Sequence, residues 1–172
     1  MRNSGAPGMA VALAVLATLG LVAAGFAQTA ATQNSGETQS PWTARQTMQP
    51  ETLAAQFLQK NSVPQPIVCV GFGTLYRQTH IHGAEFHGPA STPDGLADLK
   101  QWAANLPRNR EIVIYCGCCP FAHCPNVRPA FTTLQEMGFK SIRVLVLETG
   151  LGQDWAEKGA ERGYLTDHHG NS

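Results

Sequence analysis

The 172-residue chain lacks an excess of charge of either sign, because 12 lysines and arginines balance 12 aspartates and glutamates. A balanced chain offers no basic surface that would attract nucleic acid or an anionic membrane. Internal repeats and paired carboxylates are also missing from the sequence. We therefore expect no nucleic-acid partner, no acid–base carboxylate pair, and one globular domain of ordinary size.

Hydrophobic runs are short, with one exception at the N-terminus. Arg2 is followed by an uncharged apolar stretch that ends in small residues, with Gly25 and Ala27 placed as in a cleavage site before Gln28. This pattern predicts a signal peptide over 1–27, export to the periplasm or the medium, and no membrane association after cleavage. The alternative is an uncleaved anchor, since the run approaches the length of a membrane span.

The remaining chain predicts one folded region between two polar ends. Residues 28–47 are small and polar and predict a flexible linker, and residues 166–172 predict a disordered tail. The domain between them, 48–165, alternates strand-like and helix-like segments. Apolar β-branched runs occur at 66–72, 111–116 and 141–148, and amphipathic helical patterns at 50–60, 92–106 and 127–138. Such alternation predicts an α/β fold with a mostly parallel sheet and helices on both faces.

Cysteines are concentrated in one loop. Four of the five lie between residues 116 and 124, and Cys69, inside an apolar strand, is expected to be a core residue. Cys116 follows the strand at 111–116, and the C-terminal ends of parallel strands are where sites usually lie. Loop N–H groups from Gly117 to Ala122 and the dipole of the next helix would stabilise a Cys116 thiolate, with Arg128 as a possible fixed charge. Cys116 is therefore the candidate nucleophile.

Four stretches carry a resemblance to a known family. They are "HIHGAEF" (80–86), "IVIYC" (112–116), "LQEMGFKSIRVL" (134–145) and the Trp155 region "DWAEKG". In this order, over about residues 50–160, they resemble the rhodanese family of sulfurtransferases. The resemblance implies a three-layer rhodanese-like domain, and a persulfide on Cys116 that is filled by a small sulfur donor and emptied by a thiol or cyanide-type acceptor. It implies no cofactor, and its persulfide-stabilising positions correspond to Gly117, Cys118, Cys119, Phe121, Ala122 and Arg128.

The chain departs from the family pattern at two places. "VGF" (70–72) stands where the family usually has Asp-x-Arg, and the loop "CGCCPFAHCPNVRP" is longer than usual, with no arginine in the eleven residues after Cys116. The extended loop looks like that of a distinct exported subgroup. Because of these departures, the resemblance implies sulfur transfer more firmly for the fold than for this chain.

The same loop residues support other chemistry. Cys116, together with possible ligands Cys118, Cys119, His123 and Cys124, offers donors that suit Cu(I) or Zn(II). The C-x-x-C pair Cys116–Cys119 also suits thiol–disulfide exchange, and a hybrid would let Cys119 or Cys124 resolve a persulfide as a disulfide. Local disulfides that only stiffen the loop are a further alternative.

Overall fold

The computed structural model describes residues 42–60 and 64–168. The chain divides into two units, 1–37 and 38–172, and all described residues belong to the second. The predicted signal peptide, residues 28–41 of the predicted linker and residues 169–172 lie outside the described residues.

A five-stranded sheet forms the centre of the described unit. Its order is β1-β6-β5-β2-β4, and each neighbouring pair is parallel. The central strand β5 is buried from its second residue onward, as expected of a strand covered on both faces. The strands are β1 (Thr47–Met48), β2 (Ile67–Cys69), β4 (Glu85–Phe86), β5 (Glu111–Tyr115) and β6 (Ser141–Leu145).

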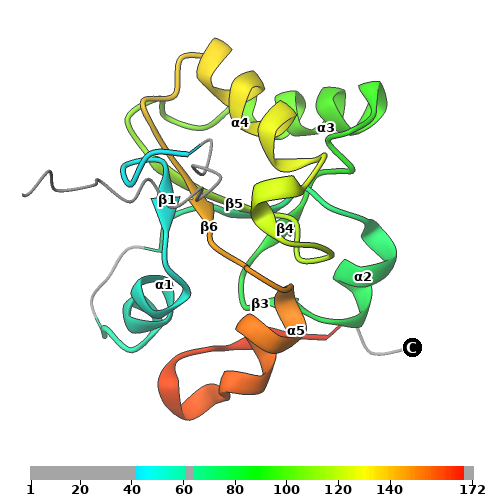
Figure 1. The fold of residues 1–172 in the computed structure, drawn as a ribbon. Coiled ribbons are helices and arrows are strands. Elements are labelled where there is room, and N and C mark those ends of the chain that lie inside the picture. The colour runs from blue at the N-terminus through cyan, green and yellow to red at the C-terminus, as the bar shows by residue number, and fades with distance from the viewer. Residues whose placement is uncertain (1–41, 61–63, 169–172) are drawn as a thin grey trace, which may run out of the picture. The chain divides into compact units, whose positions relative to one another are not determined.

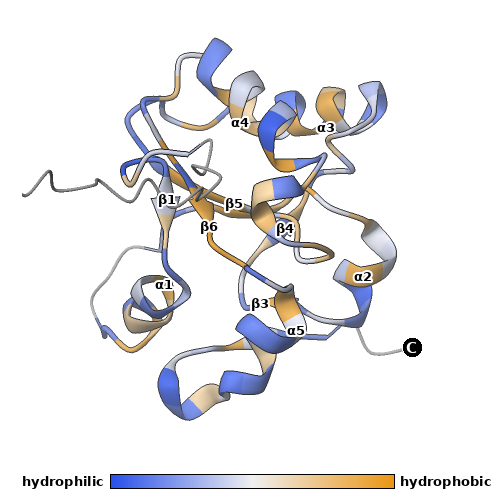
Figure 2. Cartoon of the chain, viewed as in Figure 1, coloured by the Kyte–Doolittle hydropathy of each residue, from blue (hydrophilic) through white to orange (hydrophobic). Residues whose placement is uncertain are grey.

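Helices cover both faces of the sheet (Figure 1). Alternate strand residues pack against α3 (Pro93–Ala104) and α4 (Val127–Glu136) on one face, and against α1 (Pro50–Phe57) and α5 (Leu151–Asp154) on the other. The hydropathy colouring in Figure 2 shows the same arrangement, with apolar strands between helices whose outer sides are polar. The predicted three-layer α/β fold is confirmed.

Two helix boundaries follow the sequence signals. The Thr92 hydroxyl accepts a 3.1 Å hydrogen bond from the Gly95 N–H, so Thr92 caps α3 with Pro93 at its first position. Beyond α4, Gly138 has φ +93°, a conformation that glycine adopts without steric cost and that ends the helix.

The segment after β2 is more regular than its sequence predicts. It forms α2 (Gly73–Gln78) and β3 (His80–Ile81), which were not among the predicted helices and strands. β3 pairs antiparallel with β7 (Thr166–Asp167), and the Asp167 carboxylate accepts bonds from His82 and from the Gly83 N–H. The expected disordered tail therefore has a strand at its start, because Thr166 and Asp167 find partners far away in the sequence.

The other boundary also moves. Trp42 is only 9% exposed, and its ring lies edge-on to Phe131 of α4 at 5.1 Å. The Arg128 guanidinium covers the same indole at 4.7 Å. Burial of this large side chain attaches residues 42–47 to the domain, so the end of the expected linker is part of the fold.

The C-terminal part is built from short pieces. After α5 come two 3₁₀ helices, Ala156–Lys158 and Ala160–Arg162. Trp155, between α5 and the first of these 3₁₀ helices, is fully buried and donates its indole N–H to the Leu165 carbonyl at 2.9 Å.

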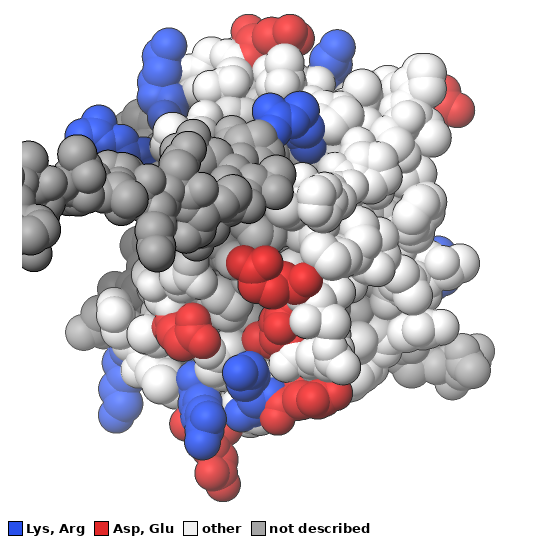
Figure 3. Space-filling model, in the orientation of Figure 1, with Lys and Arg blue, Asp and Glu red and all other residues white. Residues whose placement is uncertain are grey.

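Across residues 42–60 and 64–168, no helix is long and apolar enough to cross a membrane. Acidic and basic side chains are interspersed on the face shown in Figure 3.

Candidate active site

Cys116 lies at the C-terminal edge of the sheet, directly after β5, and its side chain is 5% exposed. The neighbouring strand approaches it closely at Gly71. A Cβ on Gly71 would lie 2.4 Å from the Cys116 carbonyl oxygen and 3.0 Å from its Sγ. Only glycine fits this contact without displacement of the two strand ends. Gly71, in the sequence stretch "VGF", therefore lies directly against the candidate nucleophile.

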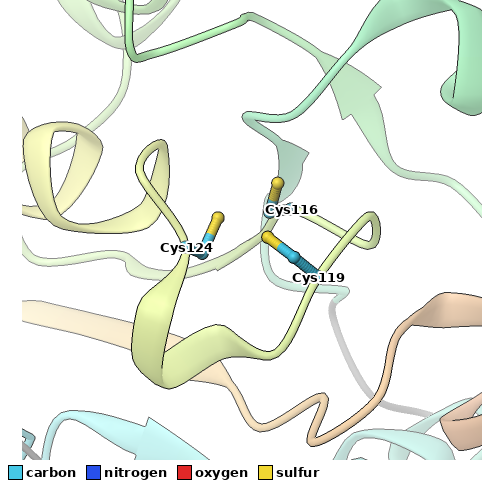
Figure 4. Close-up of side chains that lie close together, drawn as sticks. All are labelled: Cys116, Cys119 and Cys124. Atoms are coloured by element: carbon cyan, nitrogen blue, oxygen red, sulfur yellow. The ribbon is translucent and has the colours of Figure 1, made fainter.

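Sulfur atoms gather around Cys116. Its Sγ lies 3.1 Å from the Sγ of Cys118, which lies 3.4 Å from the Sγ of Cys119. The sulfurs of Cys116, Cys119 and Cys124 all lie within 4.8 Å of one another, between the end of β5 and the start of α4 (Figure 4). The structure therefore brings all four loop cysteines into one cluster, with Cys116 and Cys124 buried and the other two half-buried.

Asn126 joins this cluster from the residue before α4. Its side chain is fully buried and donates from Nδ2 to the Cys116 Sγ at 3.4 Å, while its Oδ1 accepts from the Ser91 N–H at 2.9 Å. The amide thus connects the loop before α3 to the candidate nucleophile. Asn126 therefore supplies a side-chain N–H donor to the Cys116 sulfur.

One backbone amide of the expected cradle has a partner elsewhere in the domain. The Phe121 N–H donates to the carbonyl of Leu147, just beyond the end of β6, at 2.9 Å. This N–H therefore does not donate to Cys116. The N–H groups of Asn126 and Val127, at the start of α4, hydrogen-bond to the Cys124 sulfur. The Asn126 amide and the Cys118 thiol are side-chain groups in contact with the Cys116 sulfur.

Burial keeps the surrounding thiols protonated. The pKa of Cys124 lies well above its ordinary value, chiefly because its thiol hydrogen-bonds to Cys116 and is buried. Desolvation raises the pKa of Cys118 and of Cys119, and raises the pKa of Cys69 to about 11. These four cysteines are therefore thiols at neutral pH.

A pocket of about 200 Å³ adjoins the cluster, with Cys116 and Gly117 in its wall. Thr79 is one of the lining residues, and its hydroxyl is buried with no hydrogen-bond partner among the described residues. The pocket is lined by Cys69, Leu75, Tyr76, Gln78, Thr79, Tyr115, Cys116, Gly117, Leu151 and Gly152.

Comparison with known proteins identifies the fold but not the activity. No protein-family model and no curated protein sequence matches the chain. Among solved structures, a Bacillus halodurans protein aligns with TM-score 0.54 and 17% identity, over 73% of this chain and 78% of that chain. A rhodanese-like domain from an Anabaena sp. protein aligns with TM-score 0.50 and 22% identity, over 72% of this chain and 79% of that chain. A crystal structure of that Anabaena protein aligns with TM-score 0.51 and 20% identity, over 70% of this chain and 91% of that chain.

The chain has a rhodanese-like fold. In this rhodanese-like domain, two predicted site residues are exposed at the surface. Arg128 is exposed and covers Trp42, and His123 is exposed on the 3₁₀ helix Phe121–His123. Among the described residues, the set that could share a metal ion contains cysteines and not His123. Gly117 and the half-buried Ala122 lie in the loop as expected.

Sequence analysis missed Asn126 and Thr79. Asn126 stands immediately before α4, where asparagine is common as a helix cap, so the signal was that of a cap. Its side chain does not cap α4 but turns to Ser91 and Cys116. Thr79, in the pocket wall, follows a helix that the sequence did not predict. The contacts of Asn126 are with residues distant in sequence.

Proposed function

We propose that this rhodanese-like domain carries sulfane sulfur as a persulfide on Cys116. The observation that supports this proposal best is the position of the Cys116 sulfur at the end of β5, next to an Asn126 N–H donor and the pocket beneath α2. With thiosulfate as donor, the Cys116 thiolate attacks the outer sulfur, the S–S bond breaks, and sulfite leaves with the electron pair. A thiol or cyanide acceptor then takes the outer sulfur and returns the thiolate.

Each neighbour has a part in this reaction. The Asn126 amide and the Cys124 thiol donate to the negative sulfur before and after transfer, and the first N–H groups of α4 hold Cys124 in place. The pocket beside Cys116 and Gly117 is where a small donor or acceptor would bind. Arg128 supports Trp42 instead of the sulfur.

The test is transfer of sulfur from thiosulfate to cyanide by the purified protein. Cys116→Ser should abolish it while the circular dichroism spectrum and the unfolding midpoint stay close to those of the parent chain. Turnover that survives in a folded Cys116→Ser variant would remove Cys116 from the reaction.

Metal binding is a second candidate, because the sulfurs of Cys116, Cys119 and Cys124 lie within 4.8 Å of one another. Three thiolates in an apolar loop suit Cu(I). Titration with Cu(I) against a competing chelator should show one site per chain. Cys124→Ser should weaken it by at least about tenfold, and Cys118→Ser, whose sulfur lies outside the trio, should weaken it less. A protein that binds no Cu(I) when fully reduced would exclude this candidate.

We also propose export of the protein after removal of residues 1–27. The supporting observation is the leader pattern of Arg2, the apolar run and the small residues Gly25 and Ala27. Expression of the full chain in a bacterium should yield a mature protein that begins at Gln28 by mass spectrometry. Ala27→Phe should prevent cleavage. A parent chain that keeps residues 1–27 after expression would contradict the proposal.

A further inference from the structure

The Cys118 thiol lies in direct contact with the candidate nucleophile. Its Sγ lies 3.1 Å from the Cys116 Sγ, so a disulfide bond would require the two atoms to approach by only about 1 Å. Cys119, by contrast, contacts Cys118 and lies in the wider trio with Cys116 and Cys124. Cys118 is also half-buried rather than buried, whereas Cys124 is enclosed.

Gly117 brings the two sulfurs together. Its φ of +83° folds the chain back directly after Cys116, and its carbonyl accepts from the Leu151 N–H at 3.0 Å, which anchors the turn to α5. A side chain other than glycine is strained at this φ. The close approach of residues 116 and 118 is therefore a property of the backbone and not only of two rotamers.

We propose that Cys118 resolves the Cys116 persulfide and releases its outer sulfur as hydrogen sulfide. The proton of the Cys118 thiol passes to the outer sulfur, and the Cys118 sulfur attacks the Cys116 Sγ. The bond to the outer sulfur breaks, and HS⁻ leaves with the bonding electrons. The outer sulfur gains two electrons, and Cys116 and Cys118 give them up as they form a disulfide.

The released product and the remaining disulfide define the partner. A dithiol reductant must reduce the Cys116–Cys118 disulfide by thiol–disulfide exchange before the next cycle. The half-buried sulfur of Cys118 is the one such a reductant would attack, because Cys116 is nearly inaccessible. This inference rests on the proposed persulfide, and it makes the overall reaction a dithiol-dependent reduction of sulfane sulfur to sulfide.

The experiment is a single-turnover reaction of the reduced full chain with thiosulfate, without added reductant. Sulfide is trapped and counted, and the intact mass of the protein is recorded. The parent chain should release one sulfide per chain and lose about 2 Da as the disulfide forms. Cys118→Ser should instead gain about 32 Da, a stable persulfide, and release sulfide at least about tenfold more slowly, since it lacks the intramolecular thiol.

Cys119→Ser is the comparison variant, because it removes another thiol of the same loop and keeps Cys118, and it should still form the Cys116–Cys118 disulfide with a loss of about 2 Da. Fragmentation of the oxidised parent peptide gives an independent measurement and should join Cys116 to Cys118. Sulfur uptake with unchanged sulfide release in Cys118→Ser, or a disulfide from Cys116 to Cys119 or Cys124, overturns the assignment. No sulfur uptake in either the parent or Cys118→Ser refutes the proposed function itself.

Discussion

Asn126 is expected to have two separable roles, one in stability and one in reactivity. Replacement by alanine removes the acceptor of the Ser91 N–H, which costs about 0.5–1.5 kcal/mol because Ser91 itself is exposed. Because the Asn126 side chain is fully buried, the lost amide also leaves a small cavity. Together these effects predict a decrease of about 1–3 kcal/mol in the free energy of unfolding for Asn126→Ala.

The second role is the 3.4 Å hydrogen bond from Nδ2 to the Cys116 Sγ. A hydrogen bond to a charged group contributes about 1.5–3 kcal/mol, so its loss should slow persulfide formation by roughly tenfold to a hundredfold. Urea unfolding measures the first effect, and single-turnover mass spectrometry with thiosulfate measures the second.

Asn126→Asp separates the two roles, because the carboxylate has nearly the same shape. An Asp oxygen can still accept from the Ser91 N–H, but the donor to Cys116 is replaced by a negative charge beside the reacting sulfur. We expect slower persulfide formation at pH 8 in Asn126→Asp than in Asn126→Ala. A rate for Asn126→Asp within about threefold of the parent chain would refute the reasoning, since repulsion at this distance exceeds that factor.

Three further predictions concern the framework of the site. Gly71→Ala should lower the free energy of unfolding, measured in urea, by about 3 kcal/mol and impair sulfur transfer, because its Cβ would lie 2.4 Å from the Cys116 carbonyl oxygen. The control is Gly152→Ala, whose Cβ would have no atom within 4 Å and which should change stability by less than about 1 kcal/mol. Equal effects of the two substitutions would contradict the steric argument. Trp42→Ala should cost about 3 kcal/mol, and an unchanged urea midpoint would show that residues 42–47 do not stabilise the domain. The hydrogen bond with His82, more than that with the Gly83 N–H, lowers the pKa of Asp167. The Asp167 carboxylate therefore stabilises the fold above about pH 4, and this stabilisation is lost as acid protonates the carboxylate. Asp167→Asn should therefore give a flatter acid stability profile, by less than about 1 kcal/mol for this half-exposed pair, and an unchanged profile would be inconsistent with the bond.

The sheet and its main helices were predictable because their signals are local. Continuous β-branched runs indicated β2, β5 and β6, and the 3.6-residue period indicated α3 and α4. The short pairing of β3 with β7 was not predictable, because each strand has only two residues and its partner lies more than eighty positions away. Two-residue strands carry no periodicity, and pairing across the chain decides them.

The candidate site divides in the same way. The amino-acid sequence by itself determined that a cysteine follows a buried strand, that three more cysteines share its loop, and that a helix begins soon afterwards, since all three depend on neighbours along the chain. Only the tertiary structure decided which sulfur lies against Cys116, that Asn126 reaches it from the next helix, and that Arg128 covers Trp42 instead. These are contacts between side chains whose directions are set by packing of α4 and the loop against the sheet, and no local pattern encodes such directions.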